Sequence, residues 1–296
     1  MVEVGLIFPG QGSQYVGMGK ALYQEHDIAK QTFEQANKIL DFDLAKLCFE
    51  GPAEELVRTK NCQVAIMVAS IAALRVHLLQ RSEYIPQVAL GLSLGEYTAL
   101  VAAESLSFSD AVKLVRLRGQ AMEEAGIENP GKMASIIGLD KAAVEIICEE
   151  SGAEIANLNC PGQVVVSGSI EAVDKAAILS KEKGAKRAIM LDVSGAFHST
   201  LMASASHKLS QALKDVIIMP PQIPVISNVT GSSEDDPDQI KENLIDQLSS
   251  TTRWEESIRK VASGGVETFL EIGPSQVLKG LLRRINADLA CFNIPA

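Results

Sequence analysis

The stretch Gly91-Leu92-Ser93-Leu94-Gly95-Glu96-Tyr97 places a serine between a predicted strand and a predicted helix. Residues 87–90 before it predict a short buried strand, and residues 96–103 after it predict an apolar helix. A serine on such a turn is lifted clear of the sheet, and the glycines let neighbouring backbone approach without a clash. The pattern predicts that Ser93 is a nucleophile. The alternative is that Ser93 only caps the helix.

Composition describes an ordinary globular protein. The chain has 296 residues, of which 47% are hydrophobic and 22% are charged, which suits one large domain or two unequal ones. The formal net charge of -10 argues against nucleic acid as the main partner, because a phosphate backbone requires clustered cations. The five cysteines are scattered without a CxxC spacing, and no two histidines share ligand spacing. We therefore expect no disulfide framework, no metal and no cofactor.

The apolar segments of the sequence bear on the cellular location of the protein. The N-terminal residues form an apolar strand and a glycine loop, without the pattern of a signal peptide. The most apolar run, residues 64–74, is too short to span a bilayer and predicts a buried helix. We expect a cytoplasmic protein that has no membrane partner.

A glycine-rich loop, residues 8–14, ends the apolar strand predicted for residues 2–8. Tyr15 stands where a dinucleotide fingerprint requires glycine, and Met18 stands where a P-loop requires lysine, so neither nucleotide motif is present. Exposed backbone N–H groups in this loop could bind a developing negative charge. A tight turn without a ligand is the alternative.

Helical patterns cover residues 27–47 and 54–79, and Ser107 begins a further helix that is predicted to run to about residue 125. Within that helix Arg118 lies on the same face as Leu114 and Met122, which are apolar. An inward arginine needs an anion. That anion is either a ligand or an internal carboxylate in a structural ion pair.

Between residues 127 and 196 the pattern changes to β-α-β-β-α-β, which is the order of a ferredoxin-like unit. We therefore predict an α/β protein in which residues 1–126 and 197–296 form a larger α/β-hydrolase-like domain with a mainly parallel sheet. Residues 127–196 form the inserted ferredoxin-like small subdomain. The insertion predicts a cleft between the two bodies.

His198 is the candidate base for Ser93, because it follows the insertion at a junction between a strand and a helix. The other histidines, His26, His77 and His207, are expected in the core or on the surface. No acidic residue stands out as the group that orients His198. Either that acid is hidden in ordinary sequence, or a backbone carbonyl holds the imidazole and the pair is a dyad.

Six motifs occur in order over essentially the whole chain. They are the glycine-rich loop at residues 8–14, the serine stretch at residues 91–97, Arg118-Gly119, Asn159-Cys160-Pro161-Gly162-Gln163, Phe197-His198-Ser199, and Glu271-Ile272-Gly273-Pro274. Together they resemble the malonyl-CoA:acyl carrier protein transacylase family. The resemblance implies an acyltransferase of fatty-acid synthesis that moves malonyl from malonyl-CoA to the phosphopantetheine thiol of acyl carrier protein through a malonyl-serine, with ping-pong kinetics.

The same resemblance implies roles for individual residues. Ser93 would be the nucleophile and His198 the base, and the backbone N–H groups of Gln11 and Leu94 would form the oxyanion hole. Gln247 would orient the histidine through its backbone carbonyl.

Substrate-binding roles also follow from the resemblance. Arg118 would bind the malonyl carboxylate, and Gln63, Met122, Asn159 and Phe197 would complete the substrate site. Phe197 resembles the residue of malonyl-selecting members of the family.

One position departs from the family pattern. Many members have histidine before the nucleophile, whereas this chain has Leu92. We expect Leu92 to point away from Ser93 and to alter local polarity without changing the chemistry.

The expected partners are malonyl-CoA and an acyl carrier protein, and a monomer is expected. Because carrier proteins of this pathway are acidic, docking requires a local positive patch. The alternative is that the candidate residues are only solvated charges at the ends of helices. The candidates are Lys181, Lys183, Lys186, Arg187, Arg283 and Arg284.

Three rival functions remain open at this point. A freestanding acyltransferase of a polyketide synthase would share the fold and the nucleophile. A serine hydrolase or thioesterase would pass the acyl group to water, although Arg118 argues against acetyl editing. A non-catalytic scaffold is disfavoured because both Ser93 and His198 are present.

Overall fold

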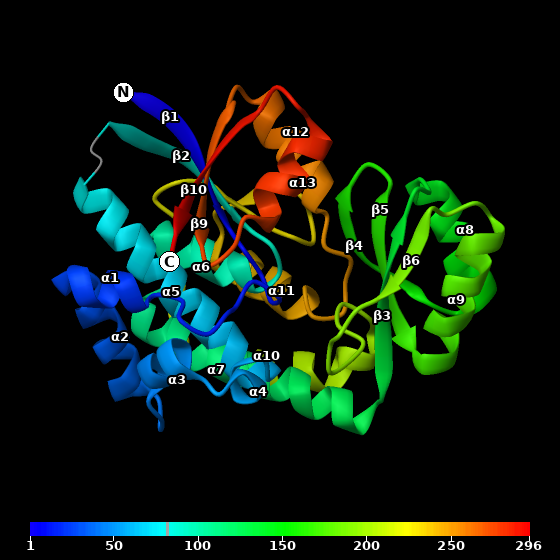
Figure 1. Ribbon diagram of the computed structural model, residues 1–296, viewed down its shortest axis with the longest axis horizontal. Coiled ribbons are helices and arrows are strands. Elements are labelled where there is room, and N and C mark those ends of the chain that lie inside the picture. Colours follow the sequence, from blue (N-terminus) through cyan, green and yellow to red (C-terminus); the bar gives the residue numbers. More distant parts are fainter. Residues whose placement is uncertain (81–82) are drawn as a thin grey trace.

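The computed structural model describes residues 1–80 and 83–296 and contains two separate β-sheets (Figure 1). The larger sheet has six strands in the order β10-β9-β1-β2-β7-β8. Every pair from β10 to β7 is parallel, and only β7 with β8 is antiparallel, so the predicted mainly parallel α/β sheet is confirmed. The strands are β1 (Val2–Phe8), β2 (Tyr84–Gly91), β7 (Val225–Ile226), β8 (Ser233–Glu234), β9 (Thr268–Gly273) and β10 (Ala290–Pro295).

Alternation along β1 gives this sheet two packed faces. Val4, Leu6 and Phe8 belong to the main core cluster, whereas Ile7 packs in a second cluster with Trp254. Helices α12 (Trp254–Ser263) and α13 (Val277–Ile285) supply the second cluster. The helices that contribute to the main cluster are α1 (Lys20–Glu25), α2 (Asp27–Ile39), α3 (Leu44–Glu50), α4 (Ala53–Leu56), α5 (Thr59–Gln80), α6 (Leu94–Ala102), α7 (Phe108–Glu128), α10 (Ala203–Leu213) and α11 (Pro237–Asp246).

Helix α5 is the central helix of the main core. It is long and apolar enough to cross a membrane by length and composition, but 83% of its most apolar window is buried inside the protein. It packs against α7 and α2 and beneath β9. The prediction that residues 64–74 form a buried helix is therefore confirmed.

The smaller sheet has the order β4-β5-β3-β6, and all its pairs are antiparallel. Helices α8 (Lys141–Ser151) and α9 (Ile170–Glu182) pack on it through their own core cluster. The predicted β-α-β-β-α-β order is confirmed, whereas the domain boundaries at residues 126/127 and 196/197 stay a prediction. The strands are β3 (Gly131–Ile137), β4 (Glu154–Cys160), β5 (Gln163–Ser169) and β6 (Arg187–Met190).

Hydrogen bonds join the edge of the smaller sheet to the larger body. Leu158 N–H donates to Thr252 O at 2.9 Å, and Thr252 N–H donates to Ala156 O at 2.8 Å. These bonds pair Thr252 with Asn157 of β4 as a parallel bridge, so the two bodies are joined directly at this edge.

Several predicted elements have different bounds in the structure. The predicted helix 27–47 is two helices, because Asp43 caps α3 by accepting from Lys46 N–H at 3.0 Å. The predicted helix 54–79 divides into α4 and α5. Helix α7 continues to Glu128 instead of ending near residue 125, so the link to the smaller sheet is shorter than predicted.

The turn before α6 provides a test of this packing. A Cβ added at Gly91 would lie 1.8 Å from Gly95 C and 2.4 Å from Glu96 N, both backbone atoms that cannot rotate away. We expect Gly91→Ala to lower the free energy of unfolding by at least about 2 kcal/mol, measured by urea denaturation. Gly280→Ala is the matched control, because nothing lies within 4 Å of its added Cβ on α13. That change should stabilise by about 0.5 kcal/mol, and equal urea midpoints for the two variants would contradict the close approach.

Candidate active site

Ser93 occupies a strained turn between β2 and α6. Its backbone has φ 52° and ψ -104°, outside the regions that a residue with a side chain favours. Ser93 N–H donates to Asn228 Oδ1 at 2.7 Å, and Gln247 Nε2 donates to Ser93 O at 3.0 Å. Asn228 Nδ2 also donates to Gly91 O at 2.7 Å. Two distant segments thus hold the turn in place on both sides of the serine.

His198 also has a left-handed backbone, with φ 59°, and is 5% exposed. Its Nδ1 lies 2.7 Å from Gln247 O. A carbonyl oxygen only accepts, so Nδ1 carries the proton and Nε2 has a free lone pair. Burial, together with the charge of Arg118, lowers the pKa of His198 to about 4. The imidazole is therefore neutral at pH 7 and able to take a proton.

Arg118 reaches the same place from α7 and is 0% exposed. Its Nη1 donates to Gln63 Oε1 at 2.6 Å, and its Nη2 donates to Gln247 Oε1 at 2.8 Å and to Ser93 Oγ at 3.0 Å. The guanidinium also lies 5.3 Å from the ring centroid of Tyr97. Within residues 1–80 and 83–296 no carboxylate forms an ion pair with it. The structural ion pair considered from the sequence is therefore not formed, and the charge is available to an anionic ligand.

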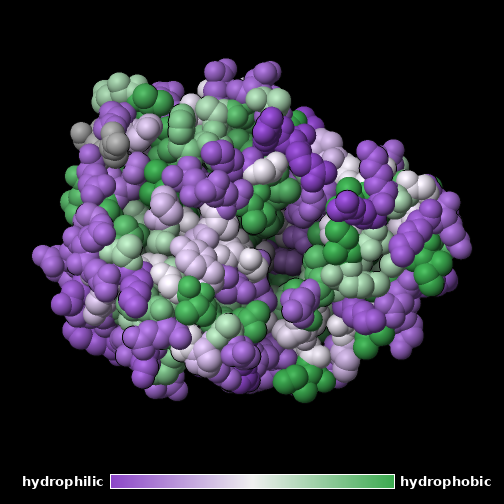
Figure 2. Space-filling view, viewed as in Figure 1, coloured by the Kyte–Doolittle hydropathy of each residue, from purple (hydrophilic) through white to green (hydrophobic). Residues whose placement is uncertain are grey.

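One cavity of about 180 Å³ contains the reactive groups. Figure 2 shows this face of the molecule hollowed where the two bodies meet. The lining comes from the larger body and from the smaller sheet, as a cleft between two bodies predicts. The lining residues are Gly10, Gln11, Gln63, Leu92, Ser93, Leu94, Arg118, Met122, Met133, Asn157, Asn159, Val165, Leu191, Phe197 and His198.

The structure brings nine of the ten predicted site residues to the wall of this cavity. The tenth, Gln247, is 0% exposed and lies behind the wall, where its carbonyl contacts His198 as predicted. Leu92 packs against the Trp254 cluster, in keeping with a side chain directed away from Ser93. Leu92 nevertheless also contributes to the cavity wall, which the sequence interpretation did not include.

Two backbone donors face the cavity without protein partners. In the described part of the chain, neither Gln11 N–H nor Leu94 N–H donates to another residue. Ser13 Oγ donates to Gly10 O at 2.8 Å and shapes the loop that presents Gln11. Two free N–H groups beside a serine are the arrangement that stabilises a tetrahedral oxyanion.

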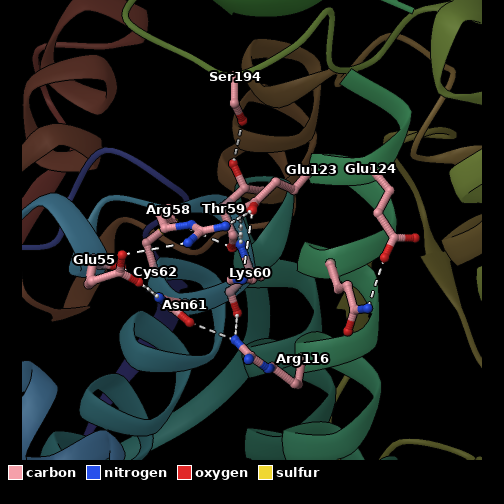
Figure 3. Close-up of polar contacts among 11 residues, drawn as sticks. Glu55, Arg58, Thr59, Lys60, Asn61, Cys62, Arg116, Glu123, Glu124 and Ser194 are labelled. Carbon is pink, nitrogen blue, oxygen red and sulfur yellow. Dashed lines mark hydrogen bonds and ion pairs between the residues drawn. The ribbon is translucent and has the colours of Figure 1, made fainter. Parts of the chain in front are cut away.

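A polar relay fixes the side chain of Gln11. Its Nε2 donates to Thr59 Oγ1 at 3.2 Å, and the same hydroxyl lies 2.8 Å from Ser194 Oγ (Figure 3). Figure 3 also shows Arg58 reaching Glu123, an ion pair of 2.7 Å that ties the start of α5 to α7. The relay connects the glycine-rich loop to the segment that returns from the smaller sheet.

Sequence reasoning missed Glu96 and Asn228. Glu96 Oε2 accepts from Gln247 Nε2 at 2.6 Å and from Asn228 N–H at 3.0 Å. Burial raises the pKa of Glu96 to about 7, against the lowering effect of these hydrogen bonds and of Arg118. The only available signal was an acidic residue at the start of a predicted apolar helix. For Asn228 the sequence carried no signal.

The family model described as the acyl transferase domain matches residues 6–288. A malonyl CoA-acyl carrier protein transacylase of Bacillus subtilis (strain 168) is 48% identical over 294 residues, covering 98% of this chain and 92% of the relative. The protein of the same name from Haemophilus influenzae is 44% identical and covers 99% of this chain and 96% of the relative.

Solved structures agree with these relatives. An acyl carrier protein S-malonyltransferase from Vibrio cholerae has a TM-score of 0.95 and 42% identity, covering 99% of this chain and 96% of that one. A complex between a type II PKS acyl-carrier protein and its malonyl-transacylase has a TM-score of 0.96 and 40% identity, with coverage of 99% and 96%. This chain therefore belongs to the malonyl-CoA:acyl carrier protein transacylase family and is an acyltransferase.

Proposed function

We propose that this enzyme transfers malonyl from malonyl-CoA to the phosphopantetheine thiol of acyl carrier protein through a malonyl ester on Ser93, and that it supplies fatty-acid synthesis. One observation carries the proposal. Ser93 Oγ lies 3.0 Å from Arg118 Nη2, in a cavity that His198 also lines. A nucleophile, a neutral base and a cation thus share one cavity, and the cation suits an acyl group that ends in a carboxylate.

In the first half-reaction, Ser93 Oγ attacks the thioester carbon while His198 Nε2 accepts the hydroxyl proton. The oxyanion that forms accepts hydrogen bonds from Gln11 N–H and Leu94 N–H, and one such donor is typically worth about 3 kcal/mol. Collapse of the intermediate breaks the carbon–sulfur bond. His198 returns the proton to the sulfur of CoA, and malonyl remains on Ser93 as an ester.

In the second half-reaction, the carrier thiol gives its proton to His198 and its sulfur attacks the ester carbon. Collapse of this intermediate breaks the bond to Ser93 Oγ, which takes the proton back. The sum is an exchange of thioesters in which no redox equivalent enters. CoA leaves before the carrier thiol reacts, so ping-pong kinetics follow.

Arg118 in the cavity wall supports selectivity for malonyl. Arg118 presents a planar fork that matches a carboxylate, whereas an acetyl group would leave the buried cation without an anion. Arg118 Nη2 donates a hydrogen bond to Ser93 Oγ. A bound carboxylate offers that nitrogen a stronger acceptor, and the serine hydroxyl is then free to turn toward His198.

A labelling experiment tests the proposed reaction. Incubation with malonyl-CoA labelled in the malonyl group should move label to the carrier protein and leave little free malonate. Without carrier, wild-type enzyme should hold the label as an ester that Ser93→Ala cannot form. Transfer of the label mainly to water, in the presence of carrier, would instead identify a hydrolase.

Substitution of Arg118 tests the proposed carboxylate site. Loss of two charge-assisted hydrogen bonds should cost at least about 3 kcal/mol, so Arg118→Ala should lower kcat/KM for malonyl-CoA about 100-fold or more. Steady-state kinetics with acetyl-CoA provide the comparison, because that substrate has no carboxylate to lose. Arg118→Lys keeps the charge without the planar fork, so its kcat/KM for malonyl-CoA should lie between those of the wild type and Arg118→Ala. Equal losses on both thioesters would rule out this role.

Carrier docking is proposed at the basic surface formed by the six cations named from the sequence. All six are exposed. Two of them have internal partners, because Lys183 pairs with Glu150 at 2.8 Å and Arg284 hydrogen-bonds Gln163. The other four, Lys181, Lys186, Arg187 and Arg283, form no ion pair within the described residues, and of these Lys186 and Arg187 are adjacent in the sequence and present two charges together.

Charge reversal tests the basic surface. Lys186→Glu with Arg187→Glu should raise the KM for carrier protein several-fold by repulsion, and leave formation of the malonyl ester from malonyl-CoA unchanged. The matched control is Lys30→Glu with Lys38→Glu on α2, at the opposite end of the molecule from β6 (Figure 1). If both double variants raise that KM equally, the effect is one of net charge and the docking site lies elsewhere.

A polyketide carrier is the second candidate partner. It is favoured by the similarity to the complex of a malonyl-transacylase with a type II PKS acyl-carrier protein. Comparison of kcat/KM for fatty-acid and polyketide carrier proteins would separate the two pathways. A monomeric state and a cytoplasmic location stay predictions.

A further inference from the structure

Glu96 is a buried carboxylate that the reaction scheme leaves without a role. It lies three residues after Ser93 on α6 and is 3% exposed. In residues 1–80 and 83–296 no cation forms an ion pair with it. Its recorded hydrogen bonds come from two neutral donors, Gln247 Nε2 at 2.6 Å and Asn228 N–H at 3.0 Å. A buried charge placed so close to a nucleophile is costly, which points to a role in the site.

Gln247 connects this carboxylate to the reactive groups. Its backbone oxygen contacts His198 Nδ1 at 2.7 Å, and its side-chain Oε1 accepts from Arg118 Nη2 at 2.8 Å. Its Nε2 donates to Glu96 and to Ser93 O. An amide has an acceptor on one side and a donor on the other. Glu96, which only accepts when ionised, and Ser93 O together hold the nitrogen of this amide, so its oxygen faces Arg118.

Asn228 forms the second connection from Glu96. Its backbone N–H is bonded to Glu96, while its side chain bonds Ser93 N–H and Gly91 O. One carboxylate oxygen thus anchors both of the segments that hold the strained turn.

We propose that Glu96 is a positioning residue that sets the selectivity for an anionic acyl group, by fixing the Gln247 amide and through it the guanidinium of Arg118. This inference rests on the proposed malonyl transfer. Glu96 also supplies the acid that the sequence failed to reveal beside Ser93 and His198. Glu96 contacts Gln247, and Gln247 contacts the imidazole, so the site is a Ser93–His198 dyad that a carboxylate supports through one intervening residue.

Protonation of Glu96 would weaken the arrangement. A neutral carboxyl group accepts hydrogen bonds less strongly than a carboxylate, so the bonds from Gln247 Nε2 and Asn228 N–H weaken and the Gln247 amide is held less firmly against Arg118. The pKa of Glu96 is raised to about 7 by burial, and the charge of Arg118 on α7 opposes this rise. Tyr97 on α6, whose own pKa is raised to about 12, stays neutral in this range. So does His198, whose pKa is lowered to about 4.

The sign of the pH effect follows. The charged acceptor is present when Glu96 is ionised, above pH 7, and its charge is lost as the pH falls through 7. Between pH 8 and pH 6 the ionised fraction of a group with this pKa falls about tenfold. The ratio of kcat/KM for malonyl-CoA to that for acetyl-CoA should therefore fall in the wild-type enzyme over this range. Titration of His198 would affect both thioesters and would occur at lower pH.

Two variants test the proposal, with kcat and KM measured for malonyl-CoA and acetyl-CoA at pH 8 and pH 6. Glu96→Ala removes the acceptor and should raise the KM for malonyl-CoA and lower the malonyl-to-acetyl ratio of kcat/KM about tenfold, beyond any loss of kcat that the two thioesters share. Glu96→Gln keeps a neutral acceptor that does not titrate, as in the protonated carboxyl group. Its ratio should be close to that of the wild type at pH 6, and should be the same at pH 8 and pH 6.

Glu271→Gln is the matched control, because Glu271 is also a fully buried carboxylate. It accepts from Leu278 N–H at 3.1 Å and Lys279 N–H at 2.7 Å at the start of α13, outside the cavity. This variant should lower the urea midpoint and leave the acyl ratio unchanged.

Two results would overturn the proposal. One is an equal loss of kcat on both thioesters in Glu96→Ala, which is the mark of a merely structural role. The other is a wild-type acyl ratio that is the same at pH 8 and pH 6. If Glu96→Ala fails to fold, the wild-type series and Glu96→Gln still decide. Failure of malonyl transfer itself would be seen separately, as a wild-type enzyme that loads no malonyl onto carrier.

Discussion

A fully buried guanidinium that forms no ion pair with a carboxylate in the described part of the chain is the constraint on which the rest of the site depends. Removing a cation from water costs several kcal/mol, and the cost is usually offset by a buried anion. Here Arg118 is surrounded instead by the amide oxygens of Gln63 and Gln247, the hydroxyl of Ser93 and the ring of Tyr97. Desolvation accordingly lowers its pKa. Neutral groups therefore supply the hydrogen bonds to the guanidinium in the described part of the chain, which is the basis for proposing it as the site of an anionic acyl group.

Both sheets contribute residues to the wall of the cavity. The larger sheet supplies the rigid part, because Ser93 follows β2 and the loop with Gln11 follows β1. The smaller sheet contributes one wall through Met133, Asn157 and Val165. Hydrogen bonds between β4 and Thr252 hold the two bodies at one place, so the width of the acyl site depends on how an inserted unit docks.

Local pattern was enough to predict some of this architecture and not the rest. The Ser93 turn and the β-α-β-β-α-β order are encoded in short runs of apolar residues and glycines, and both are confirmed. Arg118 was identified as inward from its helix face alone. Gln247 emerged only from the family resemblance, because a glutamine near the end of a helix is ordinary. Asn228 and Glu96 act through bonds that span 132 residues or more, and no local pattern reports such pairs.

The proposed oxyanion donors have a further property that follows from the pairing of β1 with β2. Phe8 and Gly91 are partners in this parallel pair, and Gln11 and Leu94 each lie three residues beyond them. Both donors are main-chain groups, so replacing either side chain leaves the N–H in place unless proline is introduced. The distance between the two N–H groups follows from the hydrogen-bonded pairing of β1 with β2. A change of side chain at residue 11 or 94 therefore leaves the position of the proposed oxyanion donor at that residue unaltered.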